Sequence, residues 1–250
     1  QRRSRRNRYP HRTMTGMTDQ KPIEVVSATR LSRADFMQRS ALGLSLQRLA
    51  DARITASIAF QNRVGLPAVY NHRLAQSSAE VLLFVHDDVW IDDIYLADRL
   101  LQACAAFDVV GVVGNTHCGE RQVSWAFTDE HLTWDAEERL SGAIANGTEP
   151  FGRVSRFGSS TTSCRLVDGV FIAVNRAAAV HRGARFDEQF SFHFYDMDFC
   201  REAHARGLRI GTWPISITHQ SGGNFRSDAW REACNRYRQK WEISAVARAQ

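Results

Sequence analysis

The sequence predicts an α/β protein built on a mostly parallel central sheet that is flanked by helices. Strand-like and helix-like patterns alternate through the first 115 residues, which is typical of a doubly wound sheet. The continuous apolar run Val81–Val85 fits a strand that is buried on both faces. With 250 residues, of which 44% are hydrophobic, the chain can fill the core of one large domain or two small ones.

The first elements follow one another as strand, polar loop and helix. Ile23–Ala28 has the pattern of a strand, and residues 34–49 have apolar side chains at helical spacing after Ser32, a residue type that caps helices. Residues 53–60 alternate as a second strand does. Leu66–Gln76 suits a helix with a proline in its first turn, and this helix leads into the central apolar run.

The apolar run ends abruptly in His86, Asp87 and Asp88. In open α/β sheets ligands bind at the carboxyl ends of strands, and adjacent carboxylates are costly to cluster unless a cation or a proton offsets them. One interpretation is therefore a site for a divalent metal and a diphosphate. The other is a solvated turn before the N-cap of the next helix. This stretch alone does not decide between them.

The middle of the chain has a different character. Residues 93–106 have helical spacing, and residues 109–113 predict another buried strand. Residues 117–165 are rich in glycine, serine, threonine and asparagine, and they show no clear period. We therefore expect loops and short strands that form a variable lobe. The aromatic side chains of this lobe are either core or a floor beneath a sugar or another acceptor.

Regular patterns return in the last third of the chain. Residues 166–175 predict a strand that Asp168 and Gly169 interrupt, where glycine permits a bulge or a close approach to a ligand. Asp196 and Asp198 lie in the first turn of a predicted helix, where the helix dipole favours carboxylates.

Two short strands and a long helix complete the predicted fold. The second of these strands ends at His219, and the flexible pair Gly222 and Gly223 follows. Apolar side chains then recur at three- and four-residue steps from Trp230 to Trp241, which predicts an amphipathic helix whose stripe packs on the core.

Composition argues against several classes of protein. The five cysteines are an odd number without a C-x-x-C pair, which argues against a disulfide framework or a zinc knuckle and favours a reducing, cytoplasmic setting. No run approaches the roughly 20 apolar residues of a membrane span, and the N-terminus has no apolar signal core.

The positive charge is concentrated at the N-terminus. Six arginines lie within residues 1–16, and the remaining 26 basic side chains balance 27 acidic ones. We interpret residues 1–16 as a disordered basic arm or an extension upstream of a native start at Met14 or Met17. The rest of the chain is nearly neutral, so we expect no nucleic-acid partner.

Taken in order, these motifs resemble those of nucleotide-sugar-dependent glycosyltransferases of the GT-A fold, in particular the inverting family 2-like group. The order is a strand-end His-Asp-Asp, a glycine-containing strand, an aromatic-Asp-x-Asp at a helix start, and a strand-end histidine. The resemblance extends from about Ile23 to Trp241. It implies a Rossmann-like sheet with a smaller acceptor-side lobe.

On the donor side, the resemblance assigns the loops after the first two strands to the nucleotide base and ribose. His86 to Asp88 occupies the D-x-D position, with histidine in place of the first aspartate. Asp88 matches the acid that binds the cation, and His219 matches the third metal-associated position. The implied nucleotide-sugar-binding residues are Ser27, Ala28, Thr29, Arg30, Asn62, Asn71, His86 and Asp87.

On the acceptor side, Asp168 and Gly169 resemble the family's strand motif. Tyr195 and Asp196 stand where the family has Glu-Asp, so Asp196 is the implied catalytic base. Tyr195 in place of glutamate is the second difference from the family motifs, after His86 in place of aspartate. Asp198 is the implied supporting or capping acid.

The resemblance implies an inverting transfer of a sugar from a nucleoside diphosphate, with a UDP-sugar favoured, to a hydroxyl of a glycan, lipid-linked or protein acceptor. A divalent metal, Mn²⁺ or Mg²⁺, would neutralise the diphosphate, and an imidazole ligand favours Mn²⁺. The Gly222–Gly223 stretch with Arg226 is a candidate lid.

Three alternatives stay open at this point. A nucleotidyltransferase would place a glycine-rich basic loop after the first strand, whereas residues 27–30 contain no glycine. A degenerate GT-A domain would bind glycans or nucleotides without catalysis. A basic-armed nucleic-acid-binding module would have a charged folded surface.

We expect one GT-A domain over residues 17–250. Its predicted parts are a nucleotide-binding half at residues 22–115, an acceptor half at residues 116–225 and a C-terminal helix at residues 226–250. The expected location is cytoplasmic, with peripheral contact at the cytoplasmic membrane face.

Overall fold

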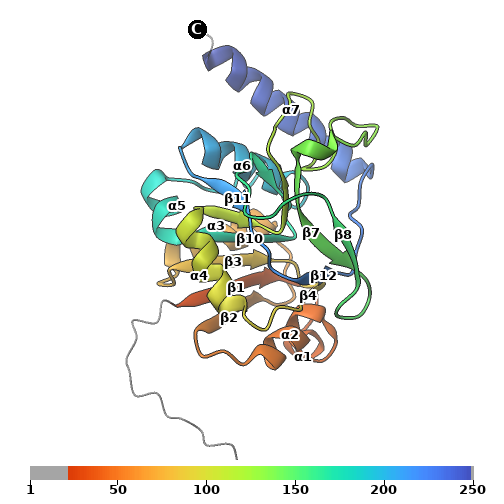
Figure 1. Ribbon diagram of the computed structural model, residues 1–250. Coiled ribbons are helices and arrows are strands. Elements are labelled where there is room, and N and C mark those ends of the chain that lie inside the picture. Colours follow the sequence, from red (N-terminus) through yellow and green to blue (C-terminus); the bar gives the residue numbers. More distant parts are fainter. Residues whose placement is uncertain (1–21, 249–250) are drawn as a thin grey trace, which may run out of the picture.

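The structure is a computed structural model that describes residues 22–248, with side chains described as far as residue 242. Its strands form two six-stranded sheets, around which the helices pack (Figure 1). The predicted basic arm at residues 1–16 lies outside the described residues.

The first sheet is the predicted central sheet. Its order is β11-β5-β10-β3-β1-β2, in which β10 runs antiparallel to β3 and β5 and the other neighbouring pairs are parallel. All five residues of β3 are buried, as the apolar run predicts. The strands are β1 (Ile23–Ala28), β2 (Ile54–Ala59), β3 (Val81–Val85), β5 (Val109–Gly111), β10 (Phe171–Asn175) and β11 (Ile210–Thr212).

The second sheet stands beside the carboxyl end of β3. Its order is β4-β12-β7-β6-β9, and β8 pairs with β7 as a hairpin, which supplies the short strands expected of the variable lobe. The strands are β4 (Val89–Ile91), β6 (Val113–Asn115), β7 (Leu140–Asn146), β8 (Arg153–Arg156), β9 (Leu166–Val167) and β12 (Ile217–His219). Both sheets take strands from each predicted half of the chain.

Two predicted strands are each split between the sheets. The strand predicted at residues 109–113 ends at Gly111 as β5, and the chain enters the second sheet as β6 after Val112. The strand predicted at residues 166–175 likewise becomes β9 and β10, which belong to different sheets. At the first break Val112 continues the buried apolar pattern, so the sequence does not reveal the change of sheet. At the second break the predicted interruption by Asp168 and Gly169 is where the chain passes from one sheet to the other.

The helix predicted at residues 34–49 is also two elements. α1 (Arg33–Arg39) begins after the predicted cap Ser32, whose side chain accepts from the Asp35 N–H. Ser40 ends α1 and caps α2 (Ala41–Leu49) by accepting from the Gly43 N–H, because serine competes with the helix for backbone groups.

The other helices follow the predictions more closely. α3 (Leu66–Gln76) has the expected bounds and crosses in front of the first sheet in Figure 1. α4 begins at Leu96 instead of residue 93, because the Asp93 carboxylate accepts from the Tyr95 N–H ahead of the helix. The remaining helices are α4 (Leu96–Ala106), the 3₁₀ turn η1 (Glu137–Arg139), α5 (Arg176–Arg182), α6 (Tyr195–Ala205) and α7 (Asp228–Arg248).

The C-terminal helix α7 docks on α6 through an apolar stripe and a buried charge. Trp230, Tyr237 and Trp241 are buried, which confirms the stripe as core. Lys240 Nζ lies 2.7 Å from Oδ1 of Asp198, a fully buried carboxylate, and 2.9 Å from Oδ2 of Asp187. The carboxylates thus hold the helix in a fixed register.

Among the described residues, no helix is long and apolar enough to cross a membrane. All five cysteines are free thiols, in agreement with the absence of a disulfide framework.

We predict that Lys240→Met lowers the free energy of unfolding by about 2–3 kcal/mol, because the buried Asp198 carboxylate loses its cation. Denaturation in urea measures the loss. Arg238→Ala is the matched control, since Arg238 lies on the same helix as Lys240 but forms its ion pair with Glu130, which is more exposed than Asp198. This substitution should cost under about 1 kcal/mol. Equal losses in the two variants would contradict the buried-charge account.

Candidate functional site

Three polar side chains meet where β3 and β12 end. His86 and Asp88 follow β3, and His219 is the last residue of β12. One ligand atom from each lies within 4.8 Å of those of the other two. The antiparallel pairing of β12 with β4 places His219 opposite Val89, the residue after Asp88, which explains how histidine and aspartate from distant segments meet.

His86 is oriented by a hydrogen-bond chain. The Tyr195 hydroxyl donates to the Gly169 carbonyl at 2.8 Å, and its oxygen lies 2.9 Å from Nε2 of His86. Because the hydroxyl has a single proton, Nε2 of His86 must donate to the Tyr195 oxygen. The lone pair of the neutral imidazole is then on Nδ1, where a cation can bind.

The charges within the cluster are complementary. His219 Nε2 lies 3.4 Å from Oδ1 of Asp88. Burial opposes the ionisation of Asp88, but the hydrogen bond and charge of His219 outweigh it and lower the pKa of Asp88 to about 2. Burial also lowers the pKa of His86, so this imidazole is neutral at pH 7. For His219, burial is outweighed by Asp88, and the net shift of its pKa is upward.

Asp196 is a carboxylate of unusual basicity. Its Oδ2 accepts from the Gly169 N–H at 2.9 Å. Burial, followed by the negative charge of Asp168, raises the pKa of Asp196 to about 7. A carboxylate with a pKa near the working pH is suited to take a proton from a hydroxyl.

Asp168 is held in place by the variable lobe. The Trp125 indole N–H donates to Asp168 Oδ2 at 2.5 Å, and the Val170 N–H donates to Oδ1 at 2.8 Å. The Trp125 contact was not expected from the sequence, because Trp125 lies 43 residues from Asp168 in a segment without periodicity.

One cavity of about 580 Å³ contains most of these groups. His86, His219, Asp168, Tyr195 and Asp196 all line it, and much of its remaining wall is aromatic. A pocket with apolar walls and a few convergent polar groups of shifted pKa has the features of an active site.

The predicted nucleotide loops come together at the ends of β1 and β2. The Asn62 N–H donates to the Thr29 carbonyl at 2.8 Å, and the Gln61 N–H donates to the Leu31 carbonyl. Arg30 is exposed. Ser27 is fully buried, and its hydroxyl has no hydrogen-bond partner among the described residues.

Other expected site residues point elsewhere. The Asn71 amide is engaged with the backbone of Phe186, both as donor and as acceptor, and it also donates to Glu188. Asp87 does not line the cavity, and its backbone carbonyl accepts from the Leu42 N–H at the start of α2. Arg226, expected in the lid, donates to the His131 carbonyl in the variable lobe.

Asp198 has a structural role in place of the expected one on the acceptor side. It is fully buried, and its Oδ1 accepts from the Trp241 indole N–H at 3.0 Å in addition to binding Lys240. Successive helical residues are about 100° apart around the axis, so Asp196 and Asp198 must face in nearly opposite directions.

A second hollow, of about 890 Å³, lies beside the edge strand β2 and contains Asn62. None of the cluster residues and neither Asp168 nor Asp196 lines it. We therefore assign the chemistry to the smaller cavity, which contains the titratable groups.

Comparison with known proteins gives a family and distant structural neighbours. A sequence profile described as a glycosyltransferase-like family matches residues 52–241. No curated protein matches the chain.

Similar solved structures include the mannosyltransferase PcManGT from Pyrobaculum calidifontis in complex with GDP-Man and Mn²⁺ (12% identity, TM-score 0.47, 84% of this chain and 59% of that one). They also include S. aureus TarS (13% identity, TM-score 0.47, 80% and 37%) and TarS 1-349 in complex with UDP-GlcNAc (13% identity, TM-score 0.46, 81% and 60%). The chain thus spans less than two thirds of each of these proteins.

The profile covers three quarters of the chain, including β3, the His86–Asp88 motif, Asp196 and His219. Together with the observed sheet order, it confirms the predicted α/β fold of the GT-A type. The chain belongs to this glycosyltransferase-like family, as its resemblance to the family 2-like group predicted.

Proposed function

We propose that the protein is an inverting glycosyltransferase that moves a sugar from a nucleoside diphosphate to an acceptor hydroxyl, with a divalent metal at the cluster of His86, Asp88 and His219. One observation carries the proposal: two of the cluster residues and Asp196 line the same cavity. A charge-neutralising site and a base therefore face a common space, as a single displacement requires.

The cluster residues fit a divalent cation. They offer an ionised carboxylate, a neutral imidazole, and a second imidazole that binds a cation on releasing its proton. Nitrogen donors favour Mn²⁺ over Mg²⁺. When bound, such a cation supplies Lewis-acid neutralisation of the departing diphosphate. PcManGT, a distant structural neighbour, has been solved in complex with GDP-Man and Mn²⁺.

The protein's own groups perform the rest of the reaction. We assign nucleotide binding to the two loops that are joined by the hydrogen bond between Asn62 and Thr29, with a UDP-sugar as the favoured donor. Asp196 accepts the proton of the acceptor hydroxyl as that oxygen attacks the anomeric carbon from the face opposite the diphosphate. One base suffices, because the configuration inverts in a single step.

We predict that Asp88→Ala removes Mn²⁺ binding and reduces nucleotide-sugar binding at least tenfold, because one ligand and the only carboxylate of the cluster are lost. Isothermal titration with Mn²⁺, Mg²⁺ and then UDP-, GDP- and dTDP-sugars measures both effects. Asp87→Ala is the control for Mn²⁺ binding, since Asp87 is not among the cluster residues. Equal Mn²⁺ affinity in Asp88→Ala and the wild type would contradict the metal assignment.

We predict that Asp196→Asn lowers the transfer rate by at least about 10²-fold while donor binding is retained, because general-base catalysis is lost. Above pH 7 and without added metal, the same variant should be more stable than the wild type by about 1–2 kcal/mol, since it no longer buries a carboxylate with a raised pKa. Glu149→Gln, at an exposed carboxylate that does not line the cavity, is the control for transfer. Unchanged transfer by Asp196→Asn would remove Asp196 from the role of base.

We predict that transfer by the wild type rises with pH through about 7 and then levels off, because only ionised Asp196 accepts a proton. In Asp168→Asn the loss of a neighbouring negative charge lowers the pKa of Asp196, so the rising limb should move to lower pH. The pH profile of kcat measures the shift. If the rising part of the pH profile of Asp168→Asn stayed in place or moved to higher pH, the assignment of Asp196 as the base would be contradicted.

A degenerate domain of the same family is the second candidate, favoured by the histidine and tyrosine that replace family acids at residues 86 and 195. It predicts metal-dependent binding of a nucleotide sugar with no transfer to any acceptor. A cytoplasmic location, predicted from the cysteines, belongs to either proposal.

A further inference from the structure

The aromatic wall of the cavity has no part in the chemistry described so far. Trp134 lines the cavity with 55% of its surface exposed, and Phe192, on the side of the cluster, is 48% exposed. Phe192 stacks on His86 at 5.8 Å between ring centroids. Two exposed rings thus bound the space in front of Asp168 and Asp196.

The ring of Trp134 is held by its aromatic neighbours. Trp134 stacks with Phe157 at 5.8 Å and an interplanar angle of 21°, and it packs edge-on to Phe127 at 4.9 Å. A backbone bridge also joins Phe127 to Trp134. An exposed indole that is fixed before a ligand arrives loses little conformational entropy on binding.

The wall is connected to the carboxylates. Phe157 packs edge-on to Trp125 at 4.9 Å, and the Trp125 indole N–H donates to Asp168. A ligand that lies on Trp134 is therefore placed relative to Asp168 and Asp196 by a continuous series of contacts.

We propose that this cavity is the acceptor subsite and that the acceptor is a glycan, one pyranose ring of which stacks on Trp134. This inference rests on the proposed function and names its acceptor class. A pyranose has an apolar C–H face for the indole and hydroxyl groups for the carboxylates and for Asn146 and His193, which also line the cavity.

An acyl chain fits this space poorly. It would lie against the carboxylates of Asp168 and Asp196, which would lose solvation without gaining a hydrogen bond. A pyranose offers a donor hydroxyl to each, so a sugar suits both the walls and the floor of the cavity.

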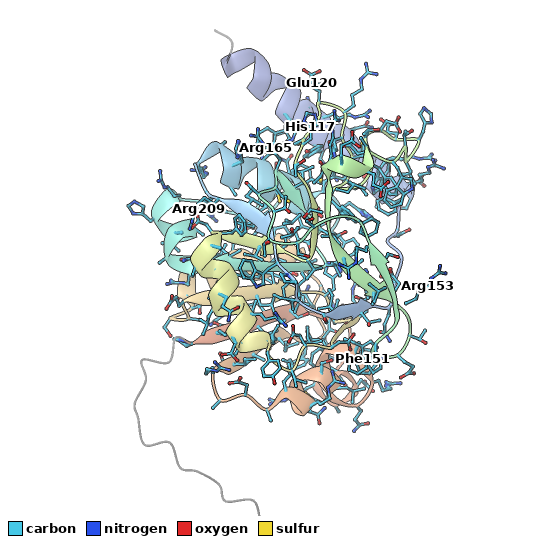
Figure 2. All side chains as sticks on the ribbon, viewed as in Figure 1. His117, Glu120, Phe151, Arg153, Arg165 and Arg209 are labelled. Atoms are coloured by element: carbon cyan, nitrogen blue, oxygen red, sulfur yellow. The ribbon has the colours of Figure 1, made fainter. Side chains whose placement is uncertain are left out.

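Saturation-transfer NMR with maltose, cellobiose, lactose and methyl hexopyranosides tests the inference on the full chain. We expect signals from at least one saccharide with the wild type, their loss in Trp134→Ala, and partial recovery in Trp134→Phe. Phe151→Ala is the matched control, because Phe151 is 71% exposed and lies outside the cavity, in the loop that joins β7 and β8 (Figure 2). A serine-rich peptide and decyl phosphate represent the other acceptor classes.

With the saccharide acceptor, Trp134→Ala should raise KM about tenfold and change kcat less than about twofold, since the ring binds the acceptor but not the reacting atoms. Donor affinity, measured by titration, should not change. The inference would be overturned by saccharide signals that do not depend on Trp134. It would also be overturned if the wild type bound the peptide or decyl phosphate but none of the saccharides. If saccharide binding depends on Trp134 but no nucleotide sugar binds, the subsite stands and the transferase proposal falls.

Discussion

The site depends on the hydrogen-bond chain from the Gly169 carbonyl through the Tyr195 hydroxyl to His86. It connects the end of β3, the joint between β9 and β10, and the first residue of α6. Gly169 also donates its N–H to Asp196, so one glycine anchors the imidazole of the cluster and the proposed base. A Cβ at this position would lie 2.5 Å from the Tyr195 oxygen, and only glycine allows such an approach.

The start of α6 is supported from the far end of the chain. Phe194, which precedes the helix, has a φ of 66°, a left-handed conformation that costs energy for a residue with a side chain. Its ring is buried against Trp230 and Tyr237 of α7. Together with Lys240 on Asp198, this packing makes α7 part of the support for Asp196. Tyr195, where the resemblance implies a glutamate, thus belongs to a scaffold that positions Asp196, the proposed base.

The sequence predicts local features of this site better than its long-range contacts. The buried run of β3 and the polar residues that end it follow from pattern alone. Asp196 and Asp198 look equivalent as first-turn acids, although helical geometry requires that only one of them face the cavity. The partners of Asn71 lie 115 and 117 residues away, and Trp125 reaches Asp168 from an aperiodic segment, so no local signal indicates either contact. The strand break at Val112 is hidden because the residues on both sides of it are buried, whereas Asp168 and Gly169 indicate the break between β9 and β10 in the sequence.

In the proposed reaction, Asp168 is the group that relates acceptor binding to proton transfer. After burial, its charge is the main cause of the raised pKa of Asp196, and it also contributes to the raised pKa of His219. Its position is set by the indole of Trp125, which packs through Phe157 on the exposed Trp134. The aromatic wall therefore does more than shape the cavity. Its Trp125 holds the Asp168 carboxylate, whose charge raises the pKa of Asp196, whereas Trp134 is separated from Trp125 by the ring of Phe157. In the proposed reaction, the wall that receives the acceptor thus also contains the side chain that fixes the neighbour of the base.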